Sequence, residues 1–155
     1  MRGIRMVAIL MGLSTAVSTY AADKVFDPTR DSAKDLKAAV EQARAEHKNI
    51  LMDVGGNWCP WCIVLDRTLK DDPELHALLT KHYVFLHVNF SRENENVNFL
   101  GSYPKATGYP AWYVLSSNGK LLKAEDTSEL EQTHKIDAGY NKETLKMFLT
   151  ENAPK

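Results

Sequence analysis

The chain has 155 residues, with 44% apolar and 25% charged side chains and a formal net charge of −1. These values are ordinary for a water-soluble globular protein, and the length allows one compact domain with one sizeable core. A charge so close to zero, with no basic cluster, argues against nucleic acid and acidic membrane surfaces as partners.

Residues 1–22 have the pattern of a cleavable secretory signal peptide. Two arginines near the start precede an apolar stretch, and the small residues Thr19 and Ala21 fit the −3 and −1 positions of a cleavage site. An uncleaved membrane anchor is the alternative, but the apolar stretch is shorter than the roughly 20 residues that a spanning helix needs. We therefore expect an exported protein in which cleavage after Ala21 or Ala22 leaves a single domain of residues 23–155.

Four segments of the mature chain carry apolar residues at the spacing of a helix. They are residues 31–47, 63–70, 73–79 and 141–149. The first opens on Asp31 or Ser32, which are both good N-cap residues. Residues 91–105 are polar around one apolar patch and predict a loop with one or two helical turns. Residues 123–139 are polar and predict no definite element.

Apolar runs indicate the strands. They cover residues 50–54, 83–90 and 111–115, and a fourth strand begins at Leu121. The dipeptide Asn118-Gly119 favours a hairpin with a type I′ turn before that fourth strand. The order of elements predicts an α/β fold, in which a central mixed sheet has helices on both faces. The first two strands are expected to be parallel and the last two antiparallel.

The only two cysteines, Cys59 and Cys62, stand three residues apart between the expected strand at 50–54 and the expected helix at 63–70. Unpaired backbone N–H groups and the positive end of a helix dipole stabilise a thiolate at such a junction. Pro60 fits the first helical turn, where a missing N–H costs nothing. The pattern therefore predicts a redox pair.

Two other uses of a cysteine pair are weaker. Exported proteins often use disulfides as braces, but a bridge across three residues closes a very small loop and gains little from chain entropy. A zinc site needs four ligands, and the five histidines are scattered without ligand spacing. Two thiolates could also hold copper(I), in which case the domain would be a binding module rather than an enzyme.

The redox motif, the acid Asp53 six residues before Cys59, and a downstream Gly-Tyr-Pro that ends at Pro110 together resemble the thioredoxin family over residues 31–150. The resemblance implies a thioredoxin fold and four roles. Cys59 would be the solvent-facing nucleophile and Cys62 the buried resolving cysteine. Asp53 would be the buried acid that helps to move the proton of the resolving thiol. Pro110 would be a cis-proline that lies against the disulfide and helps to bind substrate backbone.

Neighbouring residues are expected to shape this site. Apolar neighbours favour burial of Asp53, which raises the pKa of a carboxyl group and suits it to shuttling a proton. Tyr109, Trp58 and Trp61 are expected to bind substrate. Trp61, between the cysteines, is the one most expected to stay exposed as an apolar platform. His87 aligns with a lysine that neighbours the buried acid in thioredoxin, and we expect it to be a sheet residue rather than a catalyst.

The resemblance is strongest to exported bacterial thioredoxin-like proteins, and it implies a periplasmic thiol–disulfide oxidoreductase that needs no metal or organic cofactor. Its partners would be protein thiols and disulfides and, for a reductant, a membrane electron donor; a monomer is expected. The dipeptide Pro60-Trp61 stands in place of the Gly-Pro of thioredoxin and lacks the histidine of strong oxidants, which favours reduction. Oxidation, isomerisation, and a non-catalytic binding module for copper or a partner protein are the alternatives.

Overall fold

The computed structural model describes residues 24–155, so the predicted signal peptide lies outside the described residues. The helices and strands follow one another in the expected order. They are α1 (Ser32–Glu46), β1 (Asn49–Gly55), α2 (Pro60–Asp71), α3 (Pro73–His82), β2 (Tyr83–Asn89), α4 (Val97–Leu100), β3 (Ala111–Leu115), β4 (Leu121–Asp126), the 3-10 helix η1 (Thr127–Leu130) and α5 (Lys142–Glu151). Within residues 24–155, no helix is long and apolar enough to cross a membrane.

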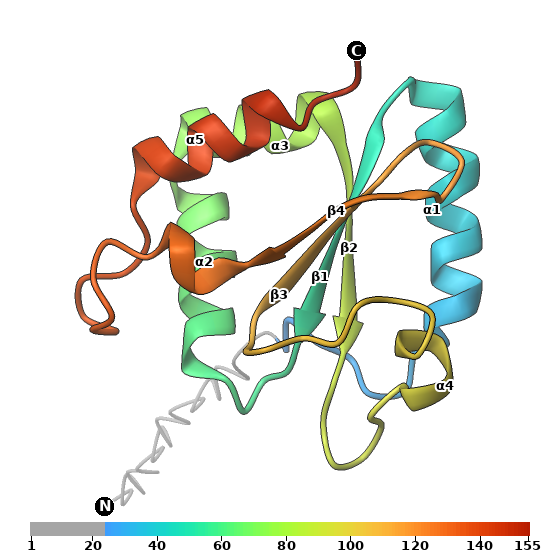
Figure 1. Ribbon diagram of the computed structural model, residues 1–155, viewed down its shortest axis with the longest axis horizontal. Helices are drawn as coiled ribbons and strands as arrows, with labels where there is room; N and C mark the ends of the chain where they lie inside the picture. The colour runs from blue at the N-terminus through green and yellow to red at the C-terminus, as the bar shows by residue number, and fades with distance from the viewer. Residues whose placement is uncertain (1–23) are drawn as a thin grey trace, which may run out of the picture.

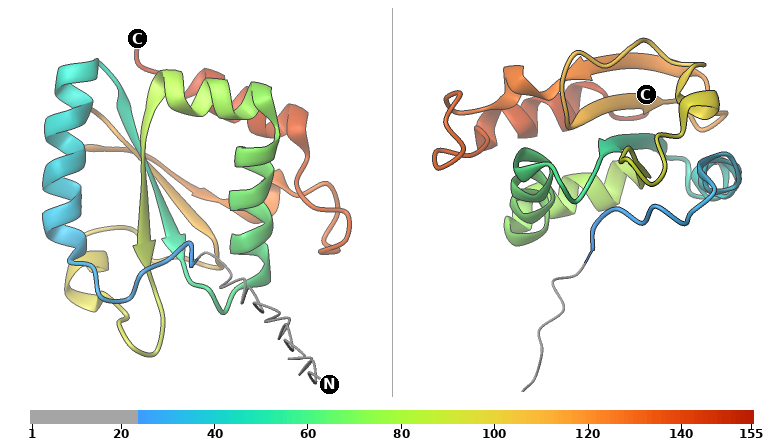
Figure 2. Two further views of the ribbon diagram at one scale, coloured as in Figure 1. Left: turned by 180° about the vertical axis from the view of Figure 1, so that it is seen from behind. Right: turned by 90° about the horizontal axis from the view of Figure 1, so that it is seen from below.

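The four strands form one mixed sheet in the order β2-β1-β3-β4. Strand β1 runs parallel to β2 and antiparallel to β3, and β3 pairs antiparallel with β4. Helix α1 covers one face of the sheet, and α2, α3 and α5 cover the other (Figure 1, Figure 2). The predicted α/β fold with a mixed sheet, helices on both faces and these strand directions is confirmed.

The central strand β1 is buried along its whole length, as its unbroken apolar run predicts. Because side chains alternate along a strand, the sheet separates two cores. The core under α1 consists of Ala39, Ala43, Ile50, Met52, Val54, Val84, Leu86, Val88, Ala111, Tyr113 and Leu115. The core under α2, α3 and α5 consists of Leu51, Leu65, Leu69, Leu75, Leu79, Tyr83, Trp112, Val114, Leu130, Tyr140, Leu145, Phe148 and Leu149. By this alternation, Asp53 faces the second core.

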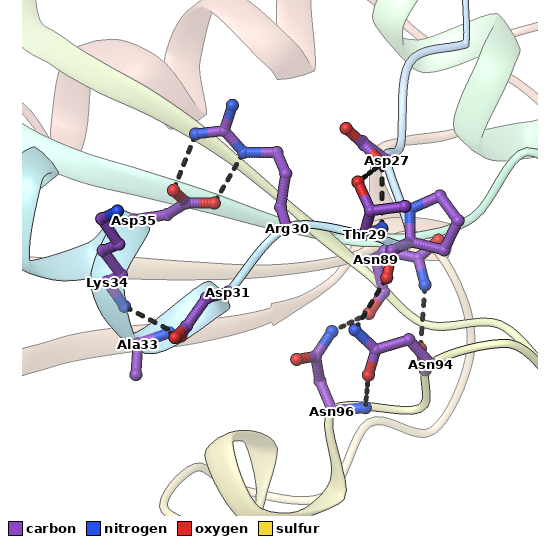
Figure 3. A network of polar contacts seen from close by, with 11 residues as sticks. Asp27, Thr29, Arg30, Asp31, Ala33, Lys34, Asp35, Asn89, Asn94 and Asn96 are labelled. Carbon is purple, nitrogen blue, oxygen red and sulfur yellow. Dashed lines mark hydrogen bonds and ion pairs between the residues drawn. The ribbon is translucent and has the colours of Figure 1, made fainter.

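Aspartate side chains begin two of the helices. Asp31 caps α1 by accepting the N–H groups of Ala33 and Lys34 at 3.0 and 3.1 Å (Figure 3). Asp72 caps α3 in the same way and also binds Lys142, at the start of α5, at 2.8 Å. The Lys142 ammonium group and the capped N–H groups lower the pKa of Asp72 to about 2. The junction of α2 and α3 is thereby tied to the last helix.

The hairpin between β3 and β4 differs from the prediction. A type I′ turn needs positive φ at both central residues, but only Gly119 has one, at 78°. The loop is instead closed by the N–H of Gly119 on the carbonyl of Ser116 and by the N–H of Ser116 on the carbonyl of Lys120, each at 2.8 Å. Asn118 uses its side-chain oxygen to accept a hydrogen bond from Arg44 of α1 at 2.9 Å. The predicted type I′ turn is therefore wrong, because the loop is longer than two residues.

The polar segment 123–139 contains the end of β4 and the short helix η1. Strand β4 lies at the edge of the sheet, and most of its side chains are exposed or half-exposed. It therefore needs no alternating apolar pattern, and this explains why residues 123–126 are polar and predict no definite element.

Candidate active site

Cys59 and Cys62 are joined in a disulfide at the start of α2, with their Cα atoms 5.3 Å apart. Cys59 is the N-cap residue and Pro60 is the first helical residue, as predicted. The backbone N–H of Cys62 points at Cys59 Sγ, with a nitrogen–sulfur distance of 3.2 Å. After reduction, this N–H group and the helix N-terminus would stabilise negative charge on Cys59.

Both cysteines are enclosed in this disulfide state. Cys59 exposes 4% of its surface and Cys62 exposes 0%. The carbonyl oxygen of Tyr109 lies 3.5 Å from Cys59 Sγ, and Phe26 and Trp61 pack against the pair. The expectation of a solvent-facing Cys59 is therefore wrong for the oxidised protein, because neighbouring chain segments cover it. Burial of Cys62 is as expected.

The loop before β3 borders the disulfide. The Tyr109–Pro110 peptide bond is cis, as the resemblance implied. Thr127 donates a hydrogen bond from Oγ1 to the carbonyl of Pro110 at 2.5 Å. That contact attaches the loop to the end of β4, so that the backbone of Tyr109 is held beside Cys59.

An aromatic platform, formed by Trp58, Phe90 and Tyr109, lies next to this loop. The rings of Trp58 and Tyr109 meet edge to face with centroids 5.8 Å apart, and Tyr109 stacks on Phe90 at 4.7 Å. Trp58 Nε1 donates to the carbonyl oxygen of Phe90 at 2.6 Å, yet the residue remains 56% exposed. The platform therefore offers a fixed, solvent-facing aromatic surface beside Cys59.

The other two tryptophans are less exposed than Trp58. Trp61 is half-buried, and its ring meets that of Tyr140 edge to face with centroids 5.3 Å apart. Trp112 is fully buried in the core under α2, α3 and α5. The expectation that Trp61 is the exposed tryptophan is wrong, because its side chain on α2 packs against Tyr140 in the loop before α5. Trp58 is the exposed tryptophan.

Asp53 lies on β1 with no exposed surface. Its Oδ1 accepts a hydrogen bond from Trp112 Nε1 at 3.1 Å, and its Oδ2 lies 3.7 Å from His87 Nε2. Burial, assisted by the charge of Asp66, raises the pKa of Asp53 to about 7, against the opposing effects of His87 and the Trp112 hydrogen bond. The expected burial of Asp53 is confirmed, and this carboxyl group can hold or release a proton near neutral pH.

Gly55 connects Asp53 to the disulfide. The two residues are separated by two positions on β1, so their side-chain directions are the same and they lie roughly 7 Å apart along the strand. A Cβ atom added to Gly55 would lie 2.5 Å from Cys62 Sγ and 3.0 Å from the Phe26 ring. Cys62 therefore occupies the space that a side chain at position 55 would fill, on the same face of β1 as the Asp53 carboxyl group.

Asp66 on α2 supplies a second buried carboxylate. Its Oδ1 lies 3.3 Å from His87 Nε2, and its Oδ2 lies 2.8 Å from Lys70 Nζ. Burial acts to raise the pKa of Asp66, but His87 and Lys70 outweigh it and hold the pKa below its usual value. Among the described residues, Asp53 Oδ2, Asp66 Oδ1 and His87 Nε2 complete no hydrogen bond. The His87 ring thus lies between the carboxyl groups of Asp53 and Asp66.

The sequence reasoning missed Asp66 and Phe26. Asp66 follows Cys62 by four positions and shares its helix face with Leu65 and Leu69, so an acid on an apolar stripe was the available signal. Phe26 belongs to no periodic element, and only its apolar character close to the predicted cleavage site could have drawn notice. His87 is a sheet residue as expected, and it pairs with Asp53 across β2 and β1, where the resemblance aligns it with the lysine beside the buried acid.

A hollow of about 400 Å³ adjoins the aromatic platform, between Phe90, Tyr109 and the loop that carries α4. Its apolar lining residues are Val54, Phe90, Val97, Leu100, Tyr103, Ala106, Tyr109 and Tyr113. Within the described part of the chain, no group of three or more histidine, cysteine or acidic side chains is arranged to hold a metal ion.

A protein-family model described as thioredoxin-like matches residues 31–117 of the chain. Among curated proteins, the disulfide bond reductase DsbH of Chlamydia pneumoniae is 28% identical over 93 residues, which cover 54% of this chain and 55% of that relative. The matched region is thus about half the length of the relative.

Two solved structures share the architecture. A disulphide isomerase from Xylella fastidiosa Temecula1 superimposes with a TM-score of 0.71 and 24% identity, over 84% of this chain and 98% of that chain. The C-terminal domain of DsbD from Neisseria meningitidis, in its oxidised form, superimposes with a TM-score of 0.56 and 21% identity, over 79% and 96%. At these identities, the two structures show a shared fold.

Proposed function

Because this chain belongs to the thioredoxin-like family, we propose that it is an exported thiol–disulfide oxidoreductase that reduces disulfides in proteins. The observation that carries the proposal is the Cys59–Cys62 disulfide at the N-terminus of α2, with the N–H of Cys62 directed at Cys59 Sγ. A disulfide that closes so short a loop restricts the unfolded chain very little. Chemistry explains the pair better than bracing does.

The reaction begins with the reduced protein. The Cys59 thiolate attacks one sulfur of a substrate disulfide, and the other substrate sulfur leaves as a thiolate. The Cys62 thiolate then attacks Cys59 Sγ, which forms the Cys59–Cys62 disulfide and releases the second substrate sulfur as a thiolate. The substrate gains two electrons, and the two cysteines of the protein lose them.

Asp53 acts as the base for the second step. Cys62 is buried, and burial favours the protonated thiol, so its proton must be removed before it attacks. The Asp53 carboxyl group lies on the same side of β1 as Cys62. With a pKa of about 7, it is partly ionised at neutral pH. His87, whose side chain is 23% exposed, lies beside Asp53 and is placed to pass the proton toward solvent.

The substrate would bind across the aromatic platform and the Pro110 loop. A polypeptide joined to Cys59 must pass the carbonyl group of Tyr109, because that oxygen lies 3.5 Å from Cys59 Sγ. The exposed face of Trp58 offers apolar contact beside it. Trp61 is half-buried and contributes to the wall of the site, where its ring packs on Tyr140.

Reduction is the direction that the motif favours, since Pro60-Trp61 carries no histidine to stabilise the thiolate of Cys59. The name of the Chlamydia relative, a disulfide bond reductase, supports the same direction. The signal peptide pattern of residues 1–22 supports export of residues 23–155 to the periplasm. A reductant in an oxidising compartment needs electrons from outside it, so a membrane electron donor would re-reduce a monomeric protein.

Insulin reduction in the presence of dithiothreitol tests the activity. The wild type should precipitate the insulin B chain faster than dithiothreitol alone, and Cys59→Ser should fall to the rate of dithiothreitol. A wild type no faster than dithiothreitol would favour a binding module for copper(I) or a partner protein. The direction is tested by the equilibrium with glutathione: we expect a potential toward about −270 mV, and a value near −120 mV would contradict the reductant role.

Trapping in the native host would name the substrates. Cys62→Ser retains the nucleophile but cannot resolve the mixed disulfide, so covalent complexes should accumulate and disappear on treatment with reductant. The matched control is Cys59→Ser combined with Cys62→Ser, which should trap nothing. Complexes that persist in the double variant would show that the adducts do not pass through Cys59.

A further inference from the structure

The segment before α1, residues 25–30, crosses the redox site on its way to that helix. In Figure 1 and Figure 2 it runs past the ends of β1 and β2 and then reaches the start of α1. We call residues 25–30 the N-terminal strap. The strap has no helix or strand of its own, so contacts to other elements decide its position.

Two asparagines hold the strap in place. Asn57, in the turn before Cys59, accepts from the backbone N–H of Phe26 at 3.2 Å and donates to its carbonyl oxygen at 2.5 Å. Asn94 donates to the carbonyl oxygen of Pro28 at 3.0 Å (Figure 3). Asn94 is itself fixed, because Asn89 Nδ2 donates to its carbonyl oxygen at 2.8 Å. The strap is therefore attached both to the redox turn and to the loop after β2.

The strap places the Phe26 side chain against the disulfide, next to Cys62. Phe26 has no exposed surface and packs with Cys59 and Cys62 in a small cluster of its own. Its ring is 3.0 Å from the position of a Cβ on Gly55 and meets the His87 ring edge to face at 5.2 Å. Phe26 thus packs against Cys62 and against the His87 ring.

The two cysteines are bordered by different groups. Cys59 lies beside the backbone of Tyr109, next to the exposed platform, and retains 4% exposure. Cys62 lies beside Gly55 and Phe26 and has no exposed surface. Phe26 belongs to a segment without helix or strand, so its truncation would open this side of Cys62 without removing a residue of a strand or a helix.

We propose that Phe26 is a positioning residue that closes Cys62 to external thiols, so that exchange with other molecules proceeds only through Cys59. The inference rests on the proposed function and adds to it which of the two sulfur atoms an external thiolate attacks. When a thiolate attacks Cys59 Sγ, the disulfide breaks and Cys62 leaves as the thiolate. With the strap open, a thiolate can attack Cys62 Sγ instead, and Cys59 leaves as the thiolate with the adduct on the wrong cysteine.

Alkylation of a single cysteine tests this inference. In the Cys59→Ser background, Cys62 is the only thiol, and its second-order rate with iodoacetamide measures access to it. Adding Phe26→Ala should raise this rate about 10-fold or more, as expected for a cysteine that becomes accessible. Phe26→Leu keeps an apolar side chain and should stay within about threefold of the background rate.

The matched control is Phe148→Ala in the same background. Phe148 is a buried phenylalanine of α5 in the core under α2, α3 and α5, where it packs on Trp112, so its truncation removes the same side chain without removing a strap contact. Any labelling it permits should pass through global unfolding and increase steeply with low urea concentrations. Labelling of the Phe26→Ala protein should be almost independent of urea, because it needs only a local opening.

Asn94→Ala provides a second variant that leaves the apolar cluster intact. It removes the hydrogen bond to Pro28 and should raise the alkylation rate of Cys62 by a smaller factor than Phe26→Ala. An unchanged rate in both variants would overturn the inference, as would an equal increase in Phe148→Ala with the same urea dependence. Since alkylation needs no turnover, protection of Cys62 by Phe26 can stand even if insulin reduction fails.

Discussion

The two faces of β1 differ in the side chains that they bury. Toward α1, the strand presents Ile50, Met52 and Val54, all packed in an apolar core. Toward α2, it presents Asp53 and Gly55, and there the strand meets the disulfide and two further ionisable groups. One face is built for packing, whereas the other gives up part of its packing to hold polar groups.

The α1 face of β1 contributes mainly to stability, whereas the α2 face holds the groups proposed to act in the reaction. A buried carboxyl group lowers stability when it ionises, while a buried methyl group does not. Asp53 has one hydrogen bond, from Trp112, and its second oxygen has none among the described residues. We infer that this face keeps a costly group because the group acts on Cys62. Substitutions on the two faces should therefore have opposite consequences.

The largest expected effect lies on the α1 face. Met52→Ala removes a fully buried side chain and should lower the free energy of unfolding by about 2–5 kcal/mol, measured by urea denaturation of the oxidised protein. Insulin reduction by the fraction that remains folded should change less than about twofold, because Met52 points away from the disulfide. A large loss of activity in fully folded protein would contradict the separation of the two faces.

The second prediction concerns Asp53→Asn, which should stabilise the protein above neutral pH. The carboxyl pKa is about 7 in the folded protein and 3.8 as the ordinary value. The stability associated with its neutral form is therefore present below pH 4 and is lost as the pH rises to 7. Asparagine removes that loss, so the gain should be about 2–4 kcal/mol at pH 8 and near zero at pH 4, measured by denaturation at both values.

The same variant should lose activity while it gains stability. Without the base, insulin reduction should fall by about 100-fold, and the rise of the wild-type rate through pH 7 should disappear. Asp72→Asn is a control at a half-buried carboxyl group that caps α3, and it should leave the pH profile unchanged. An Asp53→Asn protein with the wild-type profile would exclude Asp53 as the base.

The smallest effect is expected from Asp66→Asn. Its charge helps to raise the pKa of Asp53, so its removal should move the midpoint of the pH–rate profile to lower pH. The free energy of unfolding should change by about 1 kcal/mol or less, since its partner Lys70 is largely exposed. Lys70→Gln should not move the midpoint. A shift to higher pH in Asp66→Asn would mean that Asp66 acts mainly through His87.

Much of the fold follows from local sequence signals. The caps at Asp31 and Cys59, the apolar run of β1 and the apolar spacing of the helices placed most elements within a few residues of their observed bounds. These signals succeed because caps and periodicity depend on residues within one or two turns of each other. The predicted β3–β4 turn is wrong because the strands end at Leu115 and begin again at Leu121, which leaves a loop longer than the two residues that Asn118-Gly119 indicates.

The site was only partly accessible to the same reasoning. The cysteine pair, the burial of Asp53 and the cis bond before Pro110 could be expected from motif and resemblance. The exposure of the tryptophans could not be predicted, because nothing in the local sequence distinguishes the burial of Trp61, between the cysteines, from that of Trp58, just before them. Whether Trp58 or Trp61 faces solvent depends on how the start of α2 is oriented against Tyr140 and Phe90.

The sequence by itself determined the order of elements, the redox pair at a helix N-terminus and the acid on the central strand. Only the tertiary structure decided that Phe26 and Asp66 join His87 around that acid and that pair. These residues lie far apart along the chain, and sheet register and helix packing bring them together. Neither register nor packing leaves a local signal in sequence, so the surroundings of the two cysteines had to come from the fold.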